Sequence, residues 1–342
     1  MNKLGTALAV AGALFVSHIG HSTAADAATL ADVKARGTLK CGVSQGLQGF
    51  SAKDDKGEWK GFDVDLCRAV AAAVLGDPAK VEYVPLSAEA RFPALKKGDI
   101  DLLSRNSTWT LSREADLGLM FAGVSYYDGQ GFMVPAAKNV NGALELGGFK
   151  VCTQAGTTSA LNVTDYFKQN RMEFQLVELP NVEELTKAYD AGKCDALTTD
   201  VSQLYALRLK LSKPADHIVL PDVISKEPLG PVVRQGDDQW LNVVKWTLYA
   251  MLNAEELGVS SQTLDQALKS EKPDVKRLVG TEGAYGEQLG LTKDFAALIV
   301  KNVGNYGEVF EANIGTGSKL GIPRGINQLW SAGGIQYAPP IR

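Results

Sequence analysis

The chain has 342 residues, of which 45% are hydrophobic and 22% charged, and its net charge at pH 7 is −4. This length favours two domains, and the composition is that of an ordinary globular protein. A slightly acidic chain lacks the excess of Lys and Arg that binding to nucleic-acid phosphates requires. We therefore expect no nucleic-acid partner.

The first 25 residues have the pattern of a secretory signal peptide. Lys3 precedes an uncharged apolar run from 4 to 16, and cleavage is expected within the small residues Ala24–Ala28. The run is too short to span a bilayer, and no other stretch approaches about 18 uncharged apolar residues. This predicts a mature protein that is soluble and exported.

Helical patterns alternate with short apolar runs through most of the chain, which indicates an α/β fold with largely parallel sheets. A later Pro- and Gly-rich segment, 225–238, is typical of a connector. In chain order, the expected helices cover 30–36, 62–75, 87–97, 160–169, 182–191, 240–252 and 294–303, with Gly-rich loops after the last, and the expected strands cover 39–43, 81–84, 100–103, 149–153, 174–178 and 194–198.

Two halves of the chain resemble each other. LKCGVSQG at 39–46 matches FKVCTQAG at 149–156, and ALKKGDIDLLS at 94–104 matches AYDAGKCDALT at 188–198. We interpret the halves as two similar lobes, each with one strand end that faces a ligand, since open α/β sheets bind ligands at the carboxyl ends of their strands.

The four cysteines are widely spaced, without a C-x-x-C motif, so zinc or redox chemistry has little support and neither a metal nor a cofactor is expected. Export favours two disulfides, for which three connectivities exist. A link between lobes would block hinge motion. The lobe organisation therefore favours Cys41–Cys67 and Cys152–Cys194.

The segment 101–116 carries the most informative chemistry. A short apolar strand leads into Ser104–Thr108, and Arg113 follows five residues later. Arginine matches a carboxylate with two parallel hydrogen bonds, so Arg113 is a candidate anion clamp. The alternative is an ion pair with Glu114 or Asp116 on a solvated turn.

Residues further along the chain could complete a binding site for a zwitterion. Gly156–Ser159 precede a helix, and their N–H groups and hydroxyls suit an anion. Asp200 ends a strand and can hold an ammonium with the Thr108 hydroxyl and the Asn106 carbonyl. The alternative role for Asp200 is the N-cap of the next helix, and both roles are compatible.

Gly42–Gly46 match the G-x-S-x-G motif of α/β hydrolases, but the context argues against that chemistry. A long polar loop follows the motif where a helix is required. A serine nucleophile also needs a histidine, and His217 is the one left after removal of the signal. The chain also lacks the common metal and nucleotide motifs.

Several segments resemble family 3 extracellular solute-binding proteins, the periplasmic components of polar amino-acid ABC importers. They are GFDVDLCRAVAAAV, the run to Arg113, QAGTTSALN, KCDALTTD and SKEPLGPVVRQGDDQW, while NVGNYGEVFEANIGTGS and GGIQYAPPIR are similar to the general L-amino-acid-binding subgroup. The resemblance implies a type II periplasmic-binding-protein fold, with two lobes joined by two hinge crossings near 127–129 and 226–230.

The resemblance also implies boundaries and partners. Lobe I would comprise 26–127 and 230–342, including a C-terminal extension, and lobe II would comprise 128–229. The protein would be a monomer that delivers ligand to the permease subunits of an inner-membrane importer.

By the same resemblance, Arg113 grips the α-carboxylate together with Thr157 and Thr158, while Asp200 and Thr108 hold the α-ammonium. The ligand's side chain is expected to face Ser44, Leu47, Phe50 and Ala88. Relatives selective for cationic amino acids have an acidic residue in place of Ser44 and aromatics in place of Leu47 and Ala88. These differences predict a broad L-amino-acid binder, with an exported enzyme such as a cyclohexadienyl dehydratase as the alternative.

Overall fold

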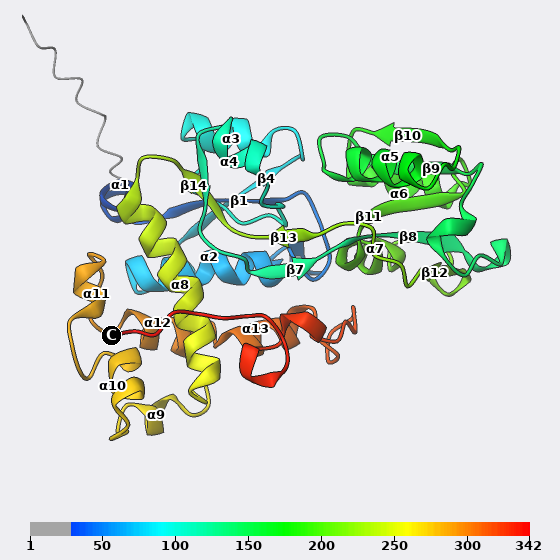
Figure 1. Cartoon of the computed structure of the whole chain (residues 1–342). Coiled ribbons are helices and arrows are strands. Elements are labelled where there is room, and N and C mark those ends of the chain that lie inside the picture. Colours follow the sequence, from blue (N-terminus) through cyan, green and yellow to red (C-terminus); the bar gives the residue numbers. More distant parts are fainter. Residues whose placement is uncertain (1–28) are drawn as a thin grey trace, which may run out of the picture.

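The computed structural model describes residues 29–342, and the expected signal peptide lies outside this range. Two five-stranded sheets, each flanked by helices, form the two lobes, which lie side by side in Figure 1 with two strands running between them. The helices that follow residue 237 pack along one side of lobe I. The α/β two-lobe fold expected from the sequence is confirmed.

The lobe I sheet has the strand order β4-β1-β5-β14-β6. Its β1 pairs in parallel with β4 and β5, and β14 then pairs antiparallel with β5 and β6. The bounds are β1 Leu39–Ser44, β4 Val81–Leu86, β5 Leu102–Leu103, β6 Leu119–Phe121 and β14 Val232–Arg234, with a short hairpin of β2 Ala52–Lys53 and β3 Trp59–Lys60. The helices of this lobe before the hinge are α1 Thr29–Arg36, α2 Phe62–Leu75, α3 Arg91–Lys97 and α4 Leu111–Ala115.

The lobe II sheet repeats this plan in the order β10-β9-β11-β8-β12. Again β9 is parallel to both neighbours, and the two remaining pairings are antiparallel, so each sheet is mixed. The strands are β8 Gln130–Pro135, β9 Lys150–Gln154, β10 Gln175–Leu179, β11 Ala196–Asp200 and β12 His217–Val219, and the helices are α5 Ser159–Gln169, α6 Val182–Asp190 and α7 Val201–Arg208. Short 3-10 helices lie at Ala136–Lys138, Ala143–Glu145, Pro214–Asp216, Gly325–Asn327 and Trp330–Ala332.

The hinge consists of β7 Tyr126–Asp128 and β13 Glu227–Leu229, which pair antiparallel between the lobes. Their positions match the two expected crossings. Directly after β13, Gly230 meets the first lobe so closely that a Cβ there would lie 2.0 Å from the Gly123 carbonyl oxygen. A side chain at Gly230 would therefore push the chain away from lobe I at the point where it re-enters.

The C-terminal region is more helical than expected. The helices are α8 Asp238–Glu256, α9 Leu264–Ala267, α10 Pro273–Val279, α11 Tyr285–Gln288, α12 Phe295–Asn302 and α13 Tyr306–Asn313. The expectation of loops after 303 was wrong, because Asn305 and Glu308 form a capping box that starts α13. That pair was a visible signal. It was outweighed by the surrounding glycines.

Most predicted elements have bounds within two residues of the observed ones, and 62–75 matches α2 at both ends. The largest shifts are of about four residues: α3 begins at Arg91 where Ser87 was expected, and α8 ends at Glu256 where residue 252 was expected. The Ser87 hydroxyl accepts a hydrogen bond from the Ala90 N–H at 3.1 Å. Residues 87–90 therefore form a turn that delays the helix and leaves Arg91 in its first turn.

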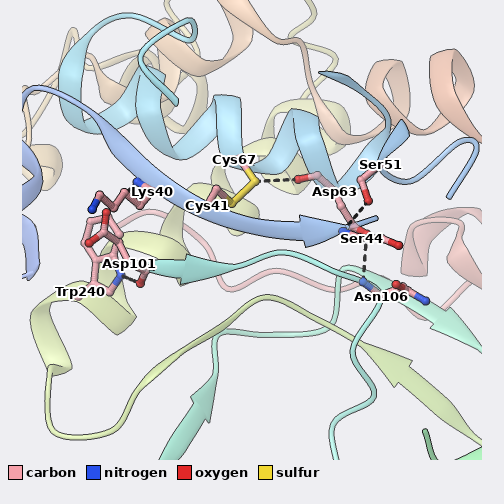
Figure 2. The surroundings of a disulfide bond; sticks show 9 residues. All are labelled: Lys40, Cys41, Ser44, Ser51, Asp63, Cys67, Asp101, Asn106 and Trp240. Atoms are coloured by element: carbon pink, nitrogen blue, oxygen red, sulfur yellow. Dashed lines mark hydrogen bonds between the residues drawn. A yellow bond between two sulfur atoms is a disulfide. The ribbon is translucent and has the colours of Figure 1, made fainter. Parts of the chain in front are cut away.

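Disulfides join Cys41 to Cys67 and Cys152 to Cys194, with Cα–Cα distances of 6.2 and 5.8 Å. Each lies within one lobe, as the sequence organisation predicted. Figure 2 shows the first, which ties β1 to α2 beside the polar end of the strand. Within residues 29–342, no helix is long and apolar enough to cross a membrane.

Candidate ligand-binding site

A polar cavity lies between the lobes, where the carboxyl ends of β1, β5, β9 and β11 meet. Its empty volume is about 380 Å³, including the solvent at its mouth. The lining residues come from both lobes: Ser44, Leu47, Arg91, Arg105, Asn106, Thr108, Arg113, Gln154, Thr157, Thr158, Ser159, Val182, Thr199, Asp200 and Gln203. Eight of the ten residues predicted to face a ligand are in this set.

Asn106 is held in the left-handed region, with φ of 23°, in the turn after β5. The Asp63 carboxylate, from the first turn of α2, accepts a hydrogen bond from the Asn106 N–H at 3.0 Å (Figure 2). Across the cleft, the Asn106 side-chain amide donates to Gln203 at 3.2 Å, while its Oδ1 atom is buried without a partner among the described residues. Asn106 thus presents a free acceptor to the cavity.

Arg113 is anchored by its own segment. Its backbone N–H is capped by the Thr110 hydroxyl, and its Nη1 donates to the Thr108 carbonyl at 2.8 Å. The alternative of a pair with Glu114 does not occur, since Glu114 accepts from the Trp109 indole at 2.8 Å. No carboxylate within the described chain pairs with Arg113. The rest of its guanidinium remains available to a ligand.

Lobe II contributes the turn between β9 and α5. The Thr157 hydroxyl donates to the Gln154 carbonyl at 2.7 Å and accepts from the Ser159 N–H at 3.3 Å, which fixes the turn. Within residues 29–342, no acceptor contacts the backbone N–H groups of Thr157 and Thr158. With the start of the 11-residue α5 behind them, these groups suit a carboxylate.

Asp200 ends β11 and is only 6% exposed. It occupies the N-cap position of α7, but its side chain makes no capping hydrogen bond, so that alternative is not realised. Burial, with the nearby negative charges of Asp128 and Glu227, raises the pKa of Asp200 well above its usual range. A cationic group at this position would relieve both effects.

Two arginines in the cavity wall were missed as site residues. Arg91 is 3% exposed and Arg105 is 4% exposed, and both line the cavity. Arg105 stands in the polar run after β5, and that position was a usable signal. Nothing in the spacing around Arg91 indicated that the first turn of α3 faces the cleft.

The hinge residue Glu227 was also missed, and its carboxylate connects the lobes. One oxygen accepts from the hydroxyls of Thr108, at 2.5 Å, and Thr158, at 2.9 Å. The other accepts from Asn162 at 2.6 Å and Ser225 at 2.7 Å. Thr108 belongs to lobe I, whereas Thr158 and Asn162 belong to lobe II. This set of partners is long-range and could not be inferred from the sequence.

Two predicted residues do not line the cavity. Phe50 is fully buried, with its ring centroid 5.7 Å from that of Tyr126. Its backbone is fixed by the close approach of Gly61, where a Cβ would lie 2.2 Å from the Phe50 carbonyl oxygen. Ala88 is 2% exposed and lies against the Gly156 turn. Of the four residues expected at the side-chain end, Ser44 and Leu47 line the cavity, together with Arg91 and Arg105, which were not predicted there.

The hydrolase motif does not form a catalytic group. Ser44 lines the cavity, whereas His217 belongs to β12 and contacts the Tyr189 hydroxyl at 2.9 Å through Nδ1. His217 is absent from the cavity lining, so the serine has no base there. In the described part of the chain, no cluster of His, Cys, Asp and Glu could hold a metal.

Two similar α/β lobes, two hinge strands and a polar cavity between the lobes define a type II periplasmic binding protein. The chain belongs to the bacterial extracellular solute-binding proteins, family 3, whose model matches residues 39–263.

Named proteins that are similar to this chain are consistent with its family. The general L-amino acid-binding periplasmic protein AapJ of Rhizobium johnstonii is 56% identical over 343 residues, covering 100% of this chain and 99% of the relative. The glutamate/glutamine/aspartate/asparagine-binding protein BztA of Rhodobacter capsulatus is 51% identical over 320 residues, covering 93% and 95%. A periplasmic binding protein from Brucella ovis, solved with glutathione bound, superposes with a TM-score of 0.91 at 55% identity, covering 92% of this chain and 99% of that one.

Proposed function

We propose that this protein is the periplasmic binding component of an ABC importer and captures L-amino acids between its lobes. The observation that carries the proposal is the cavity lined by both Arg113 from lobe I and Asp200 from lobe II. Each is buried or half-buried, and neither has an ion-pair partner within residues 29–342. An amino-acid zwitterion would provide an anionic partner for Arg113 and a cationic partner for Asp200, both attached to its α-carbon.

In the proposed complex, Arg113 and the N–H groups of Thr157 and Thr158 hold the α-carboxylate. Asp200, the Thr108 hydroxyl and an oxygen of Asn106 hold the α-ammonium. Charge-assisted hydrogen bonds of this kind are about twice as strong as neutral ones. These contacts involve atoms that every amino acid shares, so recognition at this end is independent of the side chain.

The side-chain end supports a broad ligand range. Ser44 and Leu47 line it, and the cavity adjoins a wider space of about 1210 Å³, including solvent, that shares Ser44, Arg105 and Val182 with it. Relatives named for several amino acids, and one with glutathione, agree with this breadth. Glutathione carries a free α-amino acid group at its γ-glutamyl end, and we include it among the expected ligands.

The remaining parts of the proposal concern location and assembly. We propose that residues 1–25 direct export and are removed, and that the mature protein is a periplasmic monomer that docks on permease subunits. Residues 26–127 and 230–342 would move as one body and 128–229 as the other, about the strands β7 and β13.

Calorimetric titration with the twenty L-amino acids and glutathione tests this function. We expect several chemically different amino acids to bind within about two decades of each other, because an apolar misfit costs only ~1–3 kcal/mol per methylene-sized change. Simple carboxylic acids and amines should bind far more weakly. A preference for one amino acid above about a thousandfold would refute the breadth, and no binding by any would refute the function.

Binding without turnover separates the proposal from the enzyme alternative. A dehydratase needs a protonated carboxyl over the leaving hydroxyl, and Asp200, the carboxyl that lines this cavity, is assigned to the ligand's ammonium. We expect no turnover of prephenate or arogenate. Formation of the aromatic product at a catalytic rate would instead establish the enzyme.

A further inference from the structure

The cavity has an excess of positive charge. Three guanidinium groups line it, those of Arg91, Arg105 and Arg113, against the single carboxylate of Asp200. None of the three forms an ion pair with any described residue. An α-amino acid with a neutral side chain brings one carboxylate and one ammonium. It would match Arg113 and Asp200 and leave two buried cations without a partner.

Arg91 is the most unusual of the three. Its side chain is buried, its Nε has no hydrogen-bond partner, and its guanidinium carbon lies 4.7 Å from the centre of the Phe92 ring. Burial, together with the like charges of Arg105 and Arg113, lowers the pKa of Arg91 well below its usual value. An unpaired buried cation is costly, because desolvation is not offset by an opposite charge.

Arg105 is held in place by one hydrogen bond, and the rest of its guanidinium group remains free. Its Nε donates to the Leu86 carbonyl at 3.0 Å. It lines both the inner cavity and the wider outer space, beside Ser44. It therefore stands at the side-chain end of the proposed ligand, at the mouth through which a longer side chain would extend.

Other carboxylates near the cleft already have donors. Asp63 accepts from the Asn106 N–H, and Glu227 accepts from four side chains. Asp128 accepts from the Gly129 N–H at 2.8 Å and from the Ser202 hydroxyl. They reduce the positive potential of the cleft, but none contacts the arginine forks.

We propose that Arg91 and Arg105 form a second carboxylate subsite, which receives a carboxylate on the ligand's side chain. Dicarboxylic amino acids then bind more tightly than the corresponding amides. The inference rests on the proposed function, since it requires an α-amino acid held by Arg113 and Asp200. Arg91 and Arg105 set specificity in this scheme, while the α-carbon contacts set general affinity.

The test compares isosteric ligands on matched variants. Glutamate, glutamine, aspartate, asparagine and alanine are titrated by calorimetry into the wild type, Arg91→Gln, Arg105→Gln and the control Arg208→Gln, whose side chain packs over Tyr205 outside the cavity. We expect the wild type to bind glutamate at least tenfold more tightly than glutamine. In Arg91→Gln and Arg105→Gln this ratio should fall below about threefold, and glutamate should lose more affinity than alanine. Arg208→Gln should retain the wild-type ratio.

Three results would overturn the subsite. One is a wild type that binds glutamine as tightly as glutamate. Another is an equal loss for alanine and glutamate in Arg91→Gln, which would place Arg91 at the α-carboxylate. The third is an unchanged glutamate-to-glutamine ratio in both variants. A wild type that binds none of the five ligands would instead refute the proposed function itself.

Thermal unfolding without ligand provides the folding control. Arg91→Gln should melt at or above the wild-type temperature, because the substitution removes an uncompensated buried charge. A large decrease in melting temperature would show that Arg91 stabilises the fold and would overturn its assignment to a ligand. The Arg105→Gln titrations test the subsite independently.

Discussion

The two lobes share a sheet plan but differ in charge where they face each other. In each sheet one strand, β1 in lobe I and β9 in lobe II, pairs in parallel with both of its neighbours, and two antiparallel pairings complete the sheet. Lobe I nevertheless places the guanidinium groups of Arg91, Arg105 and Arg113 on the cavity, whereas lobe II places Asp200 and neutral hydroxyls there. The charges lie in the segments that follow strands or begin helices, where substitutions leave the sheet intact.

Under the proposed function, this asymmetry would allow a single bound zwitterion to favour closure of the two lobes. A ligand with an anionic and a cationic end gains its full interaction energy only when both lobes contact it. Because an open form would offer one set of contacts at a time, the ligand favours the closed form by the contacts of the second lobe. The comparison can be tested by removing one lobe's contribution at a time.

The largest effect is expected from lobe I. Arg113→Ala should abolish measurable amino-acid binding, because a desolvated carboxylate loses its bidentate partner at a cost of several kcal/mol. Calorimetry measures the affinity, and circular dichroism should show an unchanged fold. Arg208→Ala serves as the matched control outside the cavity. Binding within about threefold of wild type would show that Arg113 is not the clamp.

The disulfides test whether each lobe is an independent body. They join cysteines 26 and 42 residues apart, so removing either pair with Cys→Ala substitutions should destabilise the protein by about 3–4 kcal/mol in urea unfolding. Amino-acid affinity should stay within about threefold under conditions where the variants are folded, since neither link crosses the cleft. More than tenfold weaker binding by a folded variant would mean that the disulfide supports the site directly.

The counterpart in lobe II is Asp200→Asn. The amide retains an acceptor for the ammonium but loses the charge, so we expect about hundredfold weaker binding, or about 2.7 kcal/mol. The ligand-free variant should be more stable than wild type, because burial raises the pKa of Asp200 and its ionised form is disfavoured in the fold. Unchanged affinity by calorimetry would place the ammonium elsewhere.

A smaller effect should appear in the pH dependence of stability. Burial raises the pKa of Asp63 to about 7 and that of Asp128 to about 6, above the ordinary 3.8. The folded protein then binds more protons than the unfolded chain, so the free energy of unfolding should fall as pH rises from 5 through 7, by at most about 1.4 kcal/mol per pH unit for each group. Urea unfolding at several pH values measures this without ligand.

The matched variant for that measurement is Asp63→Asn, which keeps an acceptor for the Asn106 N–H. Its stability should depend less on pH between 5 and 7 than that of the wild type. A wild-type stability that increases over this range, or a variant with an unchanged slope, would contradict the assignment to Asp63.

The sequence was informative where the physics is local. The periodicity of 62–75 predicted α2, and the polar run after β5 drew attention to Arg113. The similarity between the two halves paired the cysteines, while the resemblance to the family placed both hinge strands. These features depend on residues close to one another in the chain, or on a repeat in the amino-acid sequence.

The missing parts of the site depend on contacts that cross the chain. Glu227 is bonded to Thr108, 119 residues earlier, and to Thr158, 69 residues earlier, and neither partner is suggested by the residues around it. Arg91 faces the cleft because a turn at 87–90 delays α3 and sets its rotation. Phe50 does not reach the cavity for a similar reason, since its ring packs against Phe62 and Tyr126 in the core.

The last twenty residues have a consequence for how truncated or tagged versions will behave. Asn327 clasps the hinge strand, with its Oδ1 accepting from the Tyr127 N–H at 2.7 Å and its Nδ2 donating to the Tyr127 carbonyl at 2.9 Å. Gln336 and the Tyr306 hydroxyl both donate to the Ser125 carbonyl, just before that strand. The C-terminal segment thus supports one side of the hinge strand β7 through hydrogen bonds to its backbone. A chain shortened before Asn327 would lose both of these hydrogen bonds and would leave the backbone of Tyr127 unpaired on that edge.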